Sequence, residues 1–166
     1  IDALMNKEIE DTDLTAITKS KNYIAITSSE NYFFLLGKEY RYDTKIDADS
    51  EIKSISISDD EKYCAISNGI DITIIEIDSK NFYTISSQYL EDIYYVSFMP
   101  NSKDLLLCGA VENLELIKDF NTSKKLTKKI STNYYTYKIG FTPNRKKMIT
   151  IHDKGTITVW DVDSLN

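Results

Sequence analysis

Two segments of this chain, SFMPNSKDLLL (97–107) and GFTPNRKKMIT (140–150), align with each other without a gap. Two earlier segments, AITKSKNYIAI (16–26) and SISDDEKYCAI (56–66), fit the same pattern. The second position of every segment is apolar, and these positions follow one another at intervals of 40, 41 and 43 residues: Ile17, Ile57, Phe98 and Phe141. A regular interval of this length indicates that the chain repeats one structural unit four times.

Each repeat contains the same succession of strand and turn signals. Apolar and polar residues alternate in IKSISIS (52–58) and IYYVSF (93–98), which is the period of a β-strand. A tight polar turn follows, such as MPNSK (99–103), where proline and asparagine suit the turn positions. A second, a third and a weaker fourth strand come next in each unit. We therefore predict an all-β chain in which residues 1–12 are a leading segment or tail, and residues 13–166 form units starting near 13, 52, 93 and 135.

The last repeat carries the most specific signature. HDKGTITVWDVDSL (152–165) resembles the end of a WD40 repeat, with Trp160-Asp161 as the signature dipeptide. MPNSKDLLLCG (99–109) and TPNRKKMIT (142–150) resemble the hairpin of the same family. The resemblance covers nearly the whole chain and implies a WD40-like β-propeller, in which four-stranded sheets, or blades, surround a central axis.

The resemblance also implies a size and a mode of stabilisation for the ring. Most WD40 rings have about seven blades, and this chain has four repeats. We therefore expect the chain to form part of a ring that further sequence or another chain completes. Three of the four repeats lack the Trp-Asp pair, and none has the family's Gly-His start. We therefore expect apolar packing between blades to replace most of the hydrogen-bonded network that those residues provide.

Composition agrees with a globular β-protein inside the cell. Apolar residues make up 42% of the chain, with many isoleucines and 12 tyrosines, which suit a pleated and half-buried surface. Cys64 and Cys108 each lie in an apolar run, where a cysteine behaves as a small hydrophobic residue. We expect both to be reduced core thiols of an intracellular protein, in the cytoplasm or the nucleus. No apolar run approaches the ~20 residues that cross a bilayer.

Residues that carry chemistry are scarce. The single histidine, His152, precedes Asp153, and we interpret these two residues and Trp160 as a structural brace of the last blade. The acidic clusters at 47–51 and 59–61 lack the ligand offsets and the glycine of a calcium-binding loop, and are predicted to be solvated turns. No phosphate-binding loop and no nucleophile motif is found. The sequence therefore predicts no catalytic residue, no metal site and no cofactor.

A basic sector stands out against the net charge of −6. Between Lys118 and Lys147 the chain has nine lysines or arginines and one acidic residue. Seven of them are candidates for a contiguous patch that contacts phosphate or an acidic partner: Lys124, Lys125, Lys128, Lys129, Arg145, Lys146 and Lys147. The alternative is that lysines on an outer strand protect a sheet edge from aggregation.

Tyrosines and acids near the start of two repeats predict a protein-binding surface. Residues 94–95 and 134–137 hold five tyrosines, and tyrosine is frequent at interaction hot spots. Because neighbouring strand residues point in opposite directions, about half of these tyrosines belong to the core. The candidate binding set is Glu91, Asp92, Tyr95, Asn133 and Tyr135.

Two functions follow from these features. The first is a non-catalytic protein-interaction scaffold within a larger multi-subunit assembly, which the repeats and the lack of chemistry favour. The alternative is an RNA-associated propeller subunit of a ribosome-assembly or RNA-processing particle, which would use the basic patch. A propeller fold by itself does not decide between them.

Overall fold

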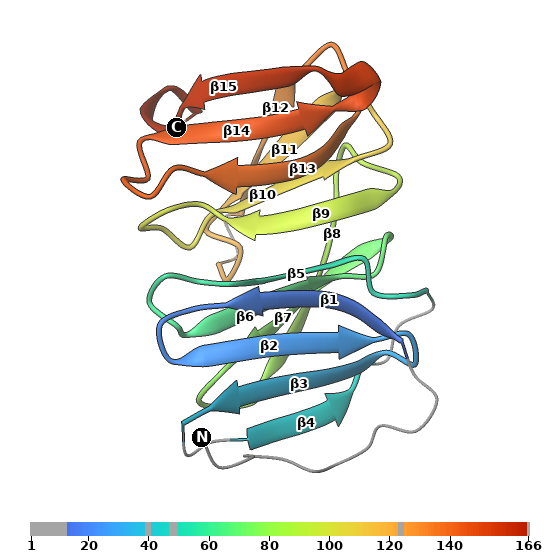
Figure 1. The fold of residues 1–166 in the computed structure, drawn as a ribbon, viewed down its shortest axis with the longest axis vertical. Helices are drawn as coiled ribbons and strands as arrows, with labels where there is room; N and C mark the ends of the chain where they lie inside the picture. Colours follow the sequence, from blue (N-terminus) through green and yellow to red (C-terminus); the bar gives the residue numbers. More distant parts are fainter. Residues whose placement is uncertain (1–12, 39–40, 47–49, 123–124, 166) are drawn as a thin grey trace.

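The computed structural model describes residues 13–38, 41–46, 50–122 and 125–165, and within these ranges the chain forms four antiparallel sheets (Figure 1). The predicted leading segment, residues 1–12, lies outside the described residues. Blades 1 and 2 contain β1 (Leu14–Lys19), β2 (Tyr23–Ser28), β3 (Tyr32–Gly37), β4 (Arg41–Lys45), β5 (Ser54–Ile57), β6 (Tyr63–Ser67), β7 (Asp71–Glu76) and β8 (Phe82–Ser86).

Blades 3 and 4 complete the stack. They contain β9 (Ile93–Phe98), β10 (Leu105–Gly109), β11 (Asn113–Lys118), β12 (Leu126–Ser131), β13 (Thr136–Phe141), β14 (Lys147–His152) and β15 (Ile157–Asp161). Two short 3-10 helices, η1 (Asp153–Gly155) and η2 (Val162–Leu165), flank β15. Blade 4 therefore has three strands in the described part of the chain, and the prediction of an all-β chain with four sheets is confirmed.

Every sheet is a meander, because consecutive strands pair with each other. The first strands β1, β5, β9 and β13 form one inner edge of the stack, where β5 contacts both β1 and β9, and β9 contacts β13. The later strands extend outward from this edge (Figure 1). Loops from an outer strand to the next inner strand thus meet at one end of the strands, and the turns that follow the inner strands meet at the other end.

Three apolar clusters hold the four blades together. Phe33 and Leu35 of blade 1 pack with Cys64 and Ile66 of blade 2. Two further clusters of the same kind lie between blades 2 and 3 and between blades 3 and 4. Alternation along each strand sends one set of side chains to the preceding blade and the other set to the following blade. Apolar packing thus forms the centre of each contact between blades.

Candidate functional site

Two loops carry most of the predicted protein-binding residues. Glu91 and Asp92 lie in the loop between β8 and β9, and Asn133 and Tyr135 lie in the loop between β12 and β13. Both loops connect an outer strand to the inner strand of the next blade, so they occupy corresponding places on blades 3 and 4. We call Glu91, Asp92, Asn133 and Tyr135 the loop face.

Backbone contacts fix the first of these loops. The carbonyl of Asp92 accepts the N–H of Ala110 at 3.1 Å, and the N–H of Ile93 donates to the carbonyl of Gly69 at 2.7 Å. A Cβ atom on Gly109 would lie 1.7 Å from the carbonyl oxygen of Asp92. The loop therefore approaches blade 3 so closely that only glycine fits at position 109.

The second loop is held in the same way and exposes an aromatic ring. The carbonyl of Tyr135 accepts the N–H of Asp153 at 2.9 Å, just as that of Asp92 accepts a bond from the neighbouring turn. Asn133 has a left-handed backbone (φ 62°), which asparagine tolerates well. The side chain of Tyr135 is 45% exposed, and Glu91 on the first loop is also exposed. The loop face thus combines a rigid backbone with side chains that reach solvent.

The fifth predicted residue, Tyr95, does not share this position. Its ring is half-buried and packs on the core between blades 3 and 4, and this burial raises the pKa of its hydroxyl. Alternation along β9 turns Tyr94 the other way, where its ring stacks on that of Tyr137 with centroids 5.9 Å apart. Tyr95 thus lies on β9, outside the two loops, and its part in partner binding stays a prediction.

The stacked tyrosines belong to a cavity that the sequence did not indicate. All four inner strands line it, and its volume is about 400 Å³. Leu14 and Ile17 of β1 contribute apolar surface, and Lys138 of β13 contributes a cation. Only the stacking of the four blades brings these strands together.

His152 lies at the centre of a hydrogen-bonded network in blade 4. The ring is 2% exposed; its Nδ1 lies 2.9 Å from Thr136 Oγ1, and its Nε2 lies 2.9 Å from Thr150 Oγ1 and 3.0 Å from Thr158 Oγ1. The indole N–H of Trp160 donates to Thr150 Oγ1 at 2.8 Å. The network joins β13, β14 and β15, and every ring nitrogen of His152 has a partner within it.

Asp153 takes a different part. Its side-chain oxygen Oδ1 is buried and has no hydrogen-bond partner among the described residues. Burial lowers the pKa of His152, and the negative charge of Asp153 opposes that shift. The ring of Tyr134 covers His152 at a centroid distance of 5.6 Å. The predicted brace therefore consists of His152 and Trp160 linked through Thr150, with Asp153 beside it.

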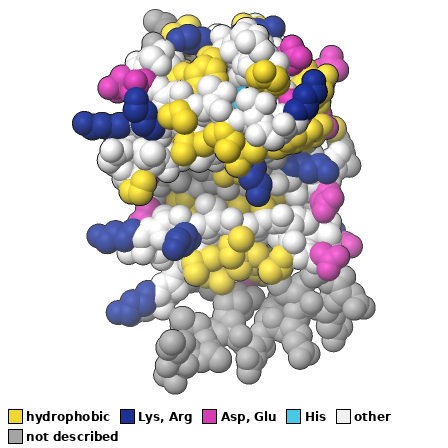
Figure 2. Space-filling model, turned by 45° about the horizontal axis from the view of Figure 1, so that its top comes forward, with side chains coloured by type: hydrophobic (Ala, Val, Ile, Leu, Met, Phe, Trp, Pro, Cys, Tyr) yellow, Lys and Arg dark blue, Asp and Glu magenta, His cyan; other side chains and the backbone are white. Residues whose placement is uncertain are grey.

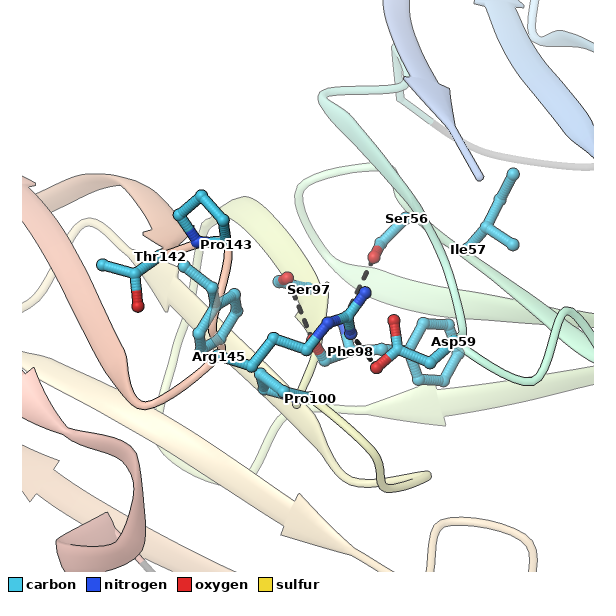
Figure 3. Close-up of a pocket in the computed structure, with 10 residues that line it drawn as sticks. Ser56, Ile57, Asp59, Ser97, Phe98, Pro100, Thr142, Pro143 and Arg145 are labelled. Carbon is cyan, nitrogen blue, oxygen red and sulfur yellow. Dashed lines mark hydrogen bonds and ion pairs between the residues drawn. The ribbon is translucent and has the colours of Figure 1, made fainter. Parts of the chain in front are cut away.

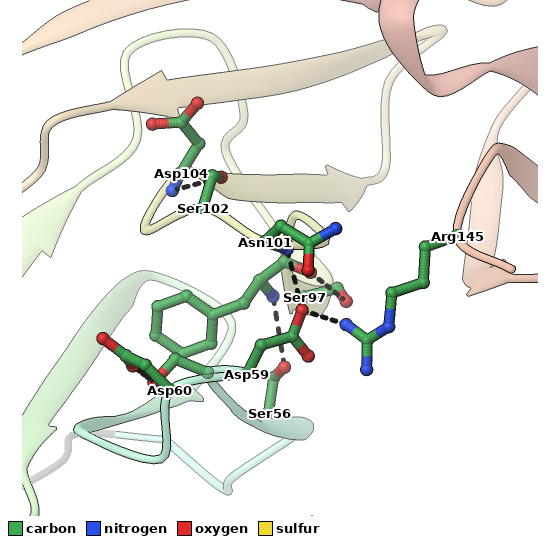
Figure 4. Close-up of polar contacts among 10 residues, drawn as sticks. Ser56, Asp59, Asp60, Ser97, Asn101, Ser102, Asp104 and Arg145 are labelled. Atoms are coloured by element: carbon green, nitrogen blue, oxygen red, sulfur yellow. Dashed lines mark hydrogen bonds and ion pairs between the residues drawn. The ribbon is translucent and has the colours of Figure 1, made fainter. Parts of the chain in front are cut away.

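The turns at the opposite end of the strands share a second polar network. Asp59 Oδ2 accepts the N–H of Asn101 at 2.7 Å and pairs with the guanidinium of Arg145 (Figure 4). A pocket of about 280 Å³ lies between these turns, and the side chain of Arg145 crosses it toward blade 2 (Figure 3). In blade 2 Glu61 also accepts the N–H of Asn22 of blade 1 at 2.7 Å. The acidic turn of blade 2 thus ties all four blades together.

Comparisons with known proteins identify this architecture. No protein-family model and no curated protein sequence matches the chain. The β-propeller domain of Cps50 (Swd1) from Myceliophteria thermophila superposes with a TM-score of 0.73 at 11% sequence identity, over 92% of this chain and 55% of that chain. A chain in the crystal structure of the mitotic checkpoint complex gives a TM-score of 0.74 at 11% identity, over 90% of this chain and 51% of that chain.

The chain has the fold of a WD40-type β-propeller. It spans about half the length of the solved chains that it matches. The four blades therefore correspond to about half of such a propeller, and the prediction that a full ring has seven blades stays a prediction.

The predicted basic patch begins on the outermost strand of propeller blade 3. Lys124 lies outside the described residues, whereas Lys125, Lys128 and Lys129 are exposed. Lys128 and Lys129 are neighbours on β12 and point to opposite faces of the sheet. The ammonium group of Lys128 donates to the carbonyl of Leu165 at 3.0 Å. The cations of this strand are therefore divided between two faces.

The basic residues of blade 4 lie at the start of β14 and in the turn before it. Arg145 is paired with Asp59 at the turn network, and the ammonium group of Lys147 lies 2.8 Å from Asp161 Oδ2. Lys146 is exposed between them. Alternation divides the lysines of β12, and ion pairs engage Arg145 and Lys147; a single contiguous patch of these residues stays a prediction.

The sequence did not lead us to predict a structural role for Glu115, whose carboxylate is buried. It lies on β11 and accepts hydrogen bonds from the hydroxyl of Ser87 and from the N–H groups of Gln88 at 2.9 Å and Tyr89 at 3.2 Å. These donors form the loop that enters blade 3 of the propeller and leads to Glu91. In the sequence NLELIK (113–118), the one sign of this role is a charged residue inside an apolar strand.

Two further tests concern ligands and membranes. Across the described ranges, no group of three or more His, Cys, Asp or Glu side chains is placed to hold a metal ion. Among the same residues, no helix is long and apolar enough to pass through a lipid bilayer.

Proposed function

We propose that this chain is a non-catalytic protein-interaction scaffold of a larger assembly, and that it contacts its partner through the loop face. The observation that carries the proposal is the rigid presentation of Tyr135 and Glu91 on two backbone-pinned loops. A partner that binds pre-ordered loops loses little conformational entropy, so more of the contact energy appears as affinity. The acids Glu91 and Asp92 favour a partner surface with basic and aromatic side chains.

Three reactive side chains support the non-catalytic part of the proposal. His152 is enclosed in its hydrogen-bonded network, and Cys64 and Cys108 are free thiols buried in the core. Burial raises the pKa of both thiols, which keeps them protonated and unreactive. A general base or nucleophile has to reach a substrate, and these groups do not. Reduced core thiols also support the proposal of an intracellular protein.

The structural comparison supports the assembly part. One of the solved structures with this fold is a complex, the mitotic checkpoint complex. Multi-subunit assembly is therefore a use to which a chain of this fold is put, and we extend it to this chain as a proposal.

Affinity purification tests the proposal with matched variants. Tyr135→Ala and Glu91→Lys alter the loop face. Lys125→Glu and Lys129→Glu alter exposed charges just before and on the outer strand β12 of blade 3. We expect the first pair to reduce the yield of specifically recovered partners at least about tenfold, which corresponds to roughly 1.4 kcal/mol. The second pair should leave the yield within about twofold.

Nuclease treatment distinguishes the RNA-associated alternative. Half of each preparation is treated with RNase before washing, and partners held by the loop face remain at the same yield. Loss of the partners in the treated half, together with sensitivity to Lys125→Glu and Lys129→Glu, would assign the function to RNA binding. Unchanged recovery with all four variants would refute the loop face as the contact surface.

A further inference from the structure

The outermost strands of the first three blades differ in charge. β4, β8 and β12 each end a four-stranded sheet, so one edge of each strand pairs with no other strand among the described residues. β4 (RYDTK) contains Asp43 and Lys45, β12 (LTKKIS) contains Lys128 and Lys129, and all four of these residues are exposed. Charged side chains on an edge strand discourage the pairing of a further strand. β8 (FYTIS) has no charged residue and lacks this protection.

The uncharged stretch extends beyond β8. Residues 81–90 (NFYTISSQYL) contain no Asp, Glu, Lys or Arg, although these four types make up 28% of the chain. Figure 2 shows such charged side chains distributed over the face of the molecule that it presents. On β8, Phe82 and Tyr83 are 46% and 39% exposed, and Thr84 and Ser86 are exposed as well. The edge of blade 2 thus presents aromatic and hydroxyl side chains to solvent.

Hydrogen bonds at the ends of β7 show which way its backbone groups point. The N–H of Glu76 donates to the carbonyl of Asn81, just before β8, at 2.9 Å. The N–H of the next residue, Ile77, donates in the other direction, to the carbonyl of Lys62 at 2.8 Å. In an antiparallel pair, the residues whose backbone groups point to the partner strand alternate with those whose groups point away. Every second residue of β8, counted from Asn81, therefore directs its backbone groups to β7.

The remaining residues of β8 direct their backbone groups outward. The register of β7 and β8 identifies these residues as Phe82, Thr84 and Ser86. No described residue forms a hydrogen bond with their N–H or C=O groups. Blade 2 lies between blades 1 and 3 and has all four strands, so this edge is part of its finished rim. Three N–H and three C=O groups are thus available in a row for another extended chain.

We propose that the outer edge of β8 binds an extended segment of a partner protein, which adds a fifth strand to blade 2. In this mode of recognition, main-chain hydrogen bonds provide affinity and the neighbouring side chains provide specificity. Phe82 and Tyr83 lie on opposite faces of the sheet, so the segment has an apolar or β-branched residue beside each of them. Because the edge carries no charge, the centre of the segment is uncharged.

The short length of β8 argues for a segment rather than a second folded copy of this chain. Five residues of antiparallel strand span about 17 Å. Two rigid rims that meet along this length bury less than the about 1,200 Å² of a stable interface between folded proteins. An extended segment needs no matching rigid surface, because it follows the twist of the strand on which it pairs. The inference uses no residue of the loop face and does not rest on the proposed contact there.

Amide hydrogen exchange, measured by NMR, tests the proposal with a peptide probe. The probe is a terminally blocked copy of residues 71–77 (DITIIEI), whose uncharged centre is the sequence that β8 already pairs with on its inner side. We expect a dissociation constant below about 1 mM. At saturation, exchange of the outward amides of Phe82, Thr84 and Ser86 should slow at least about tenfold, whereas the inward amides of Tyr83 and Ile85 should change less than about twofold.

Substitutions at Thr84 separate backbone pairing from side-chain contact. Thr84→Pro removes one outward N–H, and proline is tolerated on an edge strand where the N–H faces solvent. Thr84→Ala is the matched control, because it keeps the N–H. We expect Thr84→Pro to weaken binding of the probe at least about tenfold, and Thr84→Ala less than about threefold. Thr84→Lys gives β8 a charge like those of β12, and should also weaken binding. Far-UV circular dichroism verifies the fold of each variant.

Four results would overturn the proposal. The first is an absence of protection at the three outward amides with about 1 mM probe. The second is equal binding by Thr84→Pro and Thr84→Ala, which would show that the backbone of β8 takes no part. The third is protection of β4 or β12 in place of β8. The fourth is protection of the outward amides that rises with the concentration of the chain alone, which would assign the edge to a second copy.

A further pair of variants separates this site from the loop face. Tyr135→Ala and Glu91→Lys leave β8 unaltered, so both should bind the probe as the wild-type chain does. Thr84→Pro leaves the loop face unaltered, so partners held there should be recovered at the same yield. Loss of probe binding in Tyr135→Ala or Glu91→Lys would place the probe on the loop face and refute the edge as its site.

Discussion

Glu115 offers the sharpest test of how the loop face is held in place. Its buried carboxylate on β11 accepts three hydrogen bonds from the loop 87–89, which leads from blade 2 to the loop face. Glu115→Ala removes all three acceptors at once. The part-buried N–H of Gln88 then loses its acceptor, whereas the N–H of Tyr89 keeps Ser87 Oγ at 3.2 Å.

The magnitude follows from the number and the kind of bonds. A hydrogen bond to a charged group contributes about 1.5 to 3 kcal/mol, but the loop is part-buried and water replaces some of the lost bonds. We therefore expect Glu115→Ala to lower the free energy of unfolding by about 3 kcal/mol, or the melting temperature by roughly 6 to 12 °C. Glu115→Gln keeps one acceptor oxygen and the length of the side chain, and should cost about 1 to 2 kcal/mol.

Urea unfolding measures the change. Far-UV circular dichroism follows the sheets, and fluorescence of the single tryptophan, Trp160, follows blade 4. Glu112→Ala is the matched control, because Glu112 is an exposed acid just before the same strand. If Glu115→Ala costs less than about 1 kcal/mol, or no more than the control, the carboxylate does not anchor the loop.

Three further predictions concern pH, backbone packing and surface charge. Burial lowers the pKa of His152 below its ordinary 6.5, so the unfolded chain binds the proton at a higher pH than the folded chain does. The free energy of unfolding should therefore decrease as the pH falls below about 6.5. An NMR titration that gives an ordinary pKa for His152 would contradict this. Gly109→Ala should lower the free energy of unfolding, measured in urea, by about 2 kcal/mol or more. Gly140→Ala should lower it by less than about 0.5 kcal/mol, because the space around Gly140 is open. Asp59→Asn should lower the free energy of unfolding by less than about 1 kcal/mol, and by still less in high salt, because the ion pair with Arg145 is exposed. A larger decrease that does not depend on salt would show that this ion pair contributes strongly to the contact between blades.

The fold was accessible from the sequence because its signals are local and repeated. The strand predicted at 93–98 has the bounds of β9, and the turn that follows it contains Asn101 in a left-handed conformation. Alternation, turn chemistry and the repeat interval each depend on residues close in the chain. Four registered copies of one pattern made the fold class recognisable, even though one repeat alone has the Trp-Asp pair.

The candidate site was predicted less well, because it depends on contacts between blades. Alternation separated Tyr94 from Tyr95 but did not say which of the two faces the core. The count of basic residues placed Arg145 in one group with the lysines of β12. In the structure, Arg145 forms an ion pair with Asp59, which lies 86 residues earlier in the chain. Neither result follows from local sequence, since both depend on which neighbouring sheet each side chain meets.

The sequence by itself determined the all-β class, the four repeats and the enclosure of two cysteines in apolar strands, since short-range periodicity encodes all three. Tertiary structure alone decided which acids became structural. Glu115 clamps a loop of the preceding blade, and Asp59 joins the turns of three blades. The physical reason is that a sheet has two faces, and the burial of each face is set by the sheet that stacks on it rather than by its own residues.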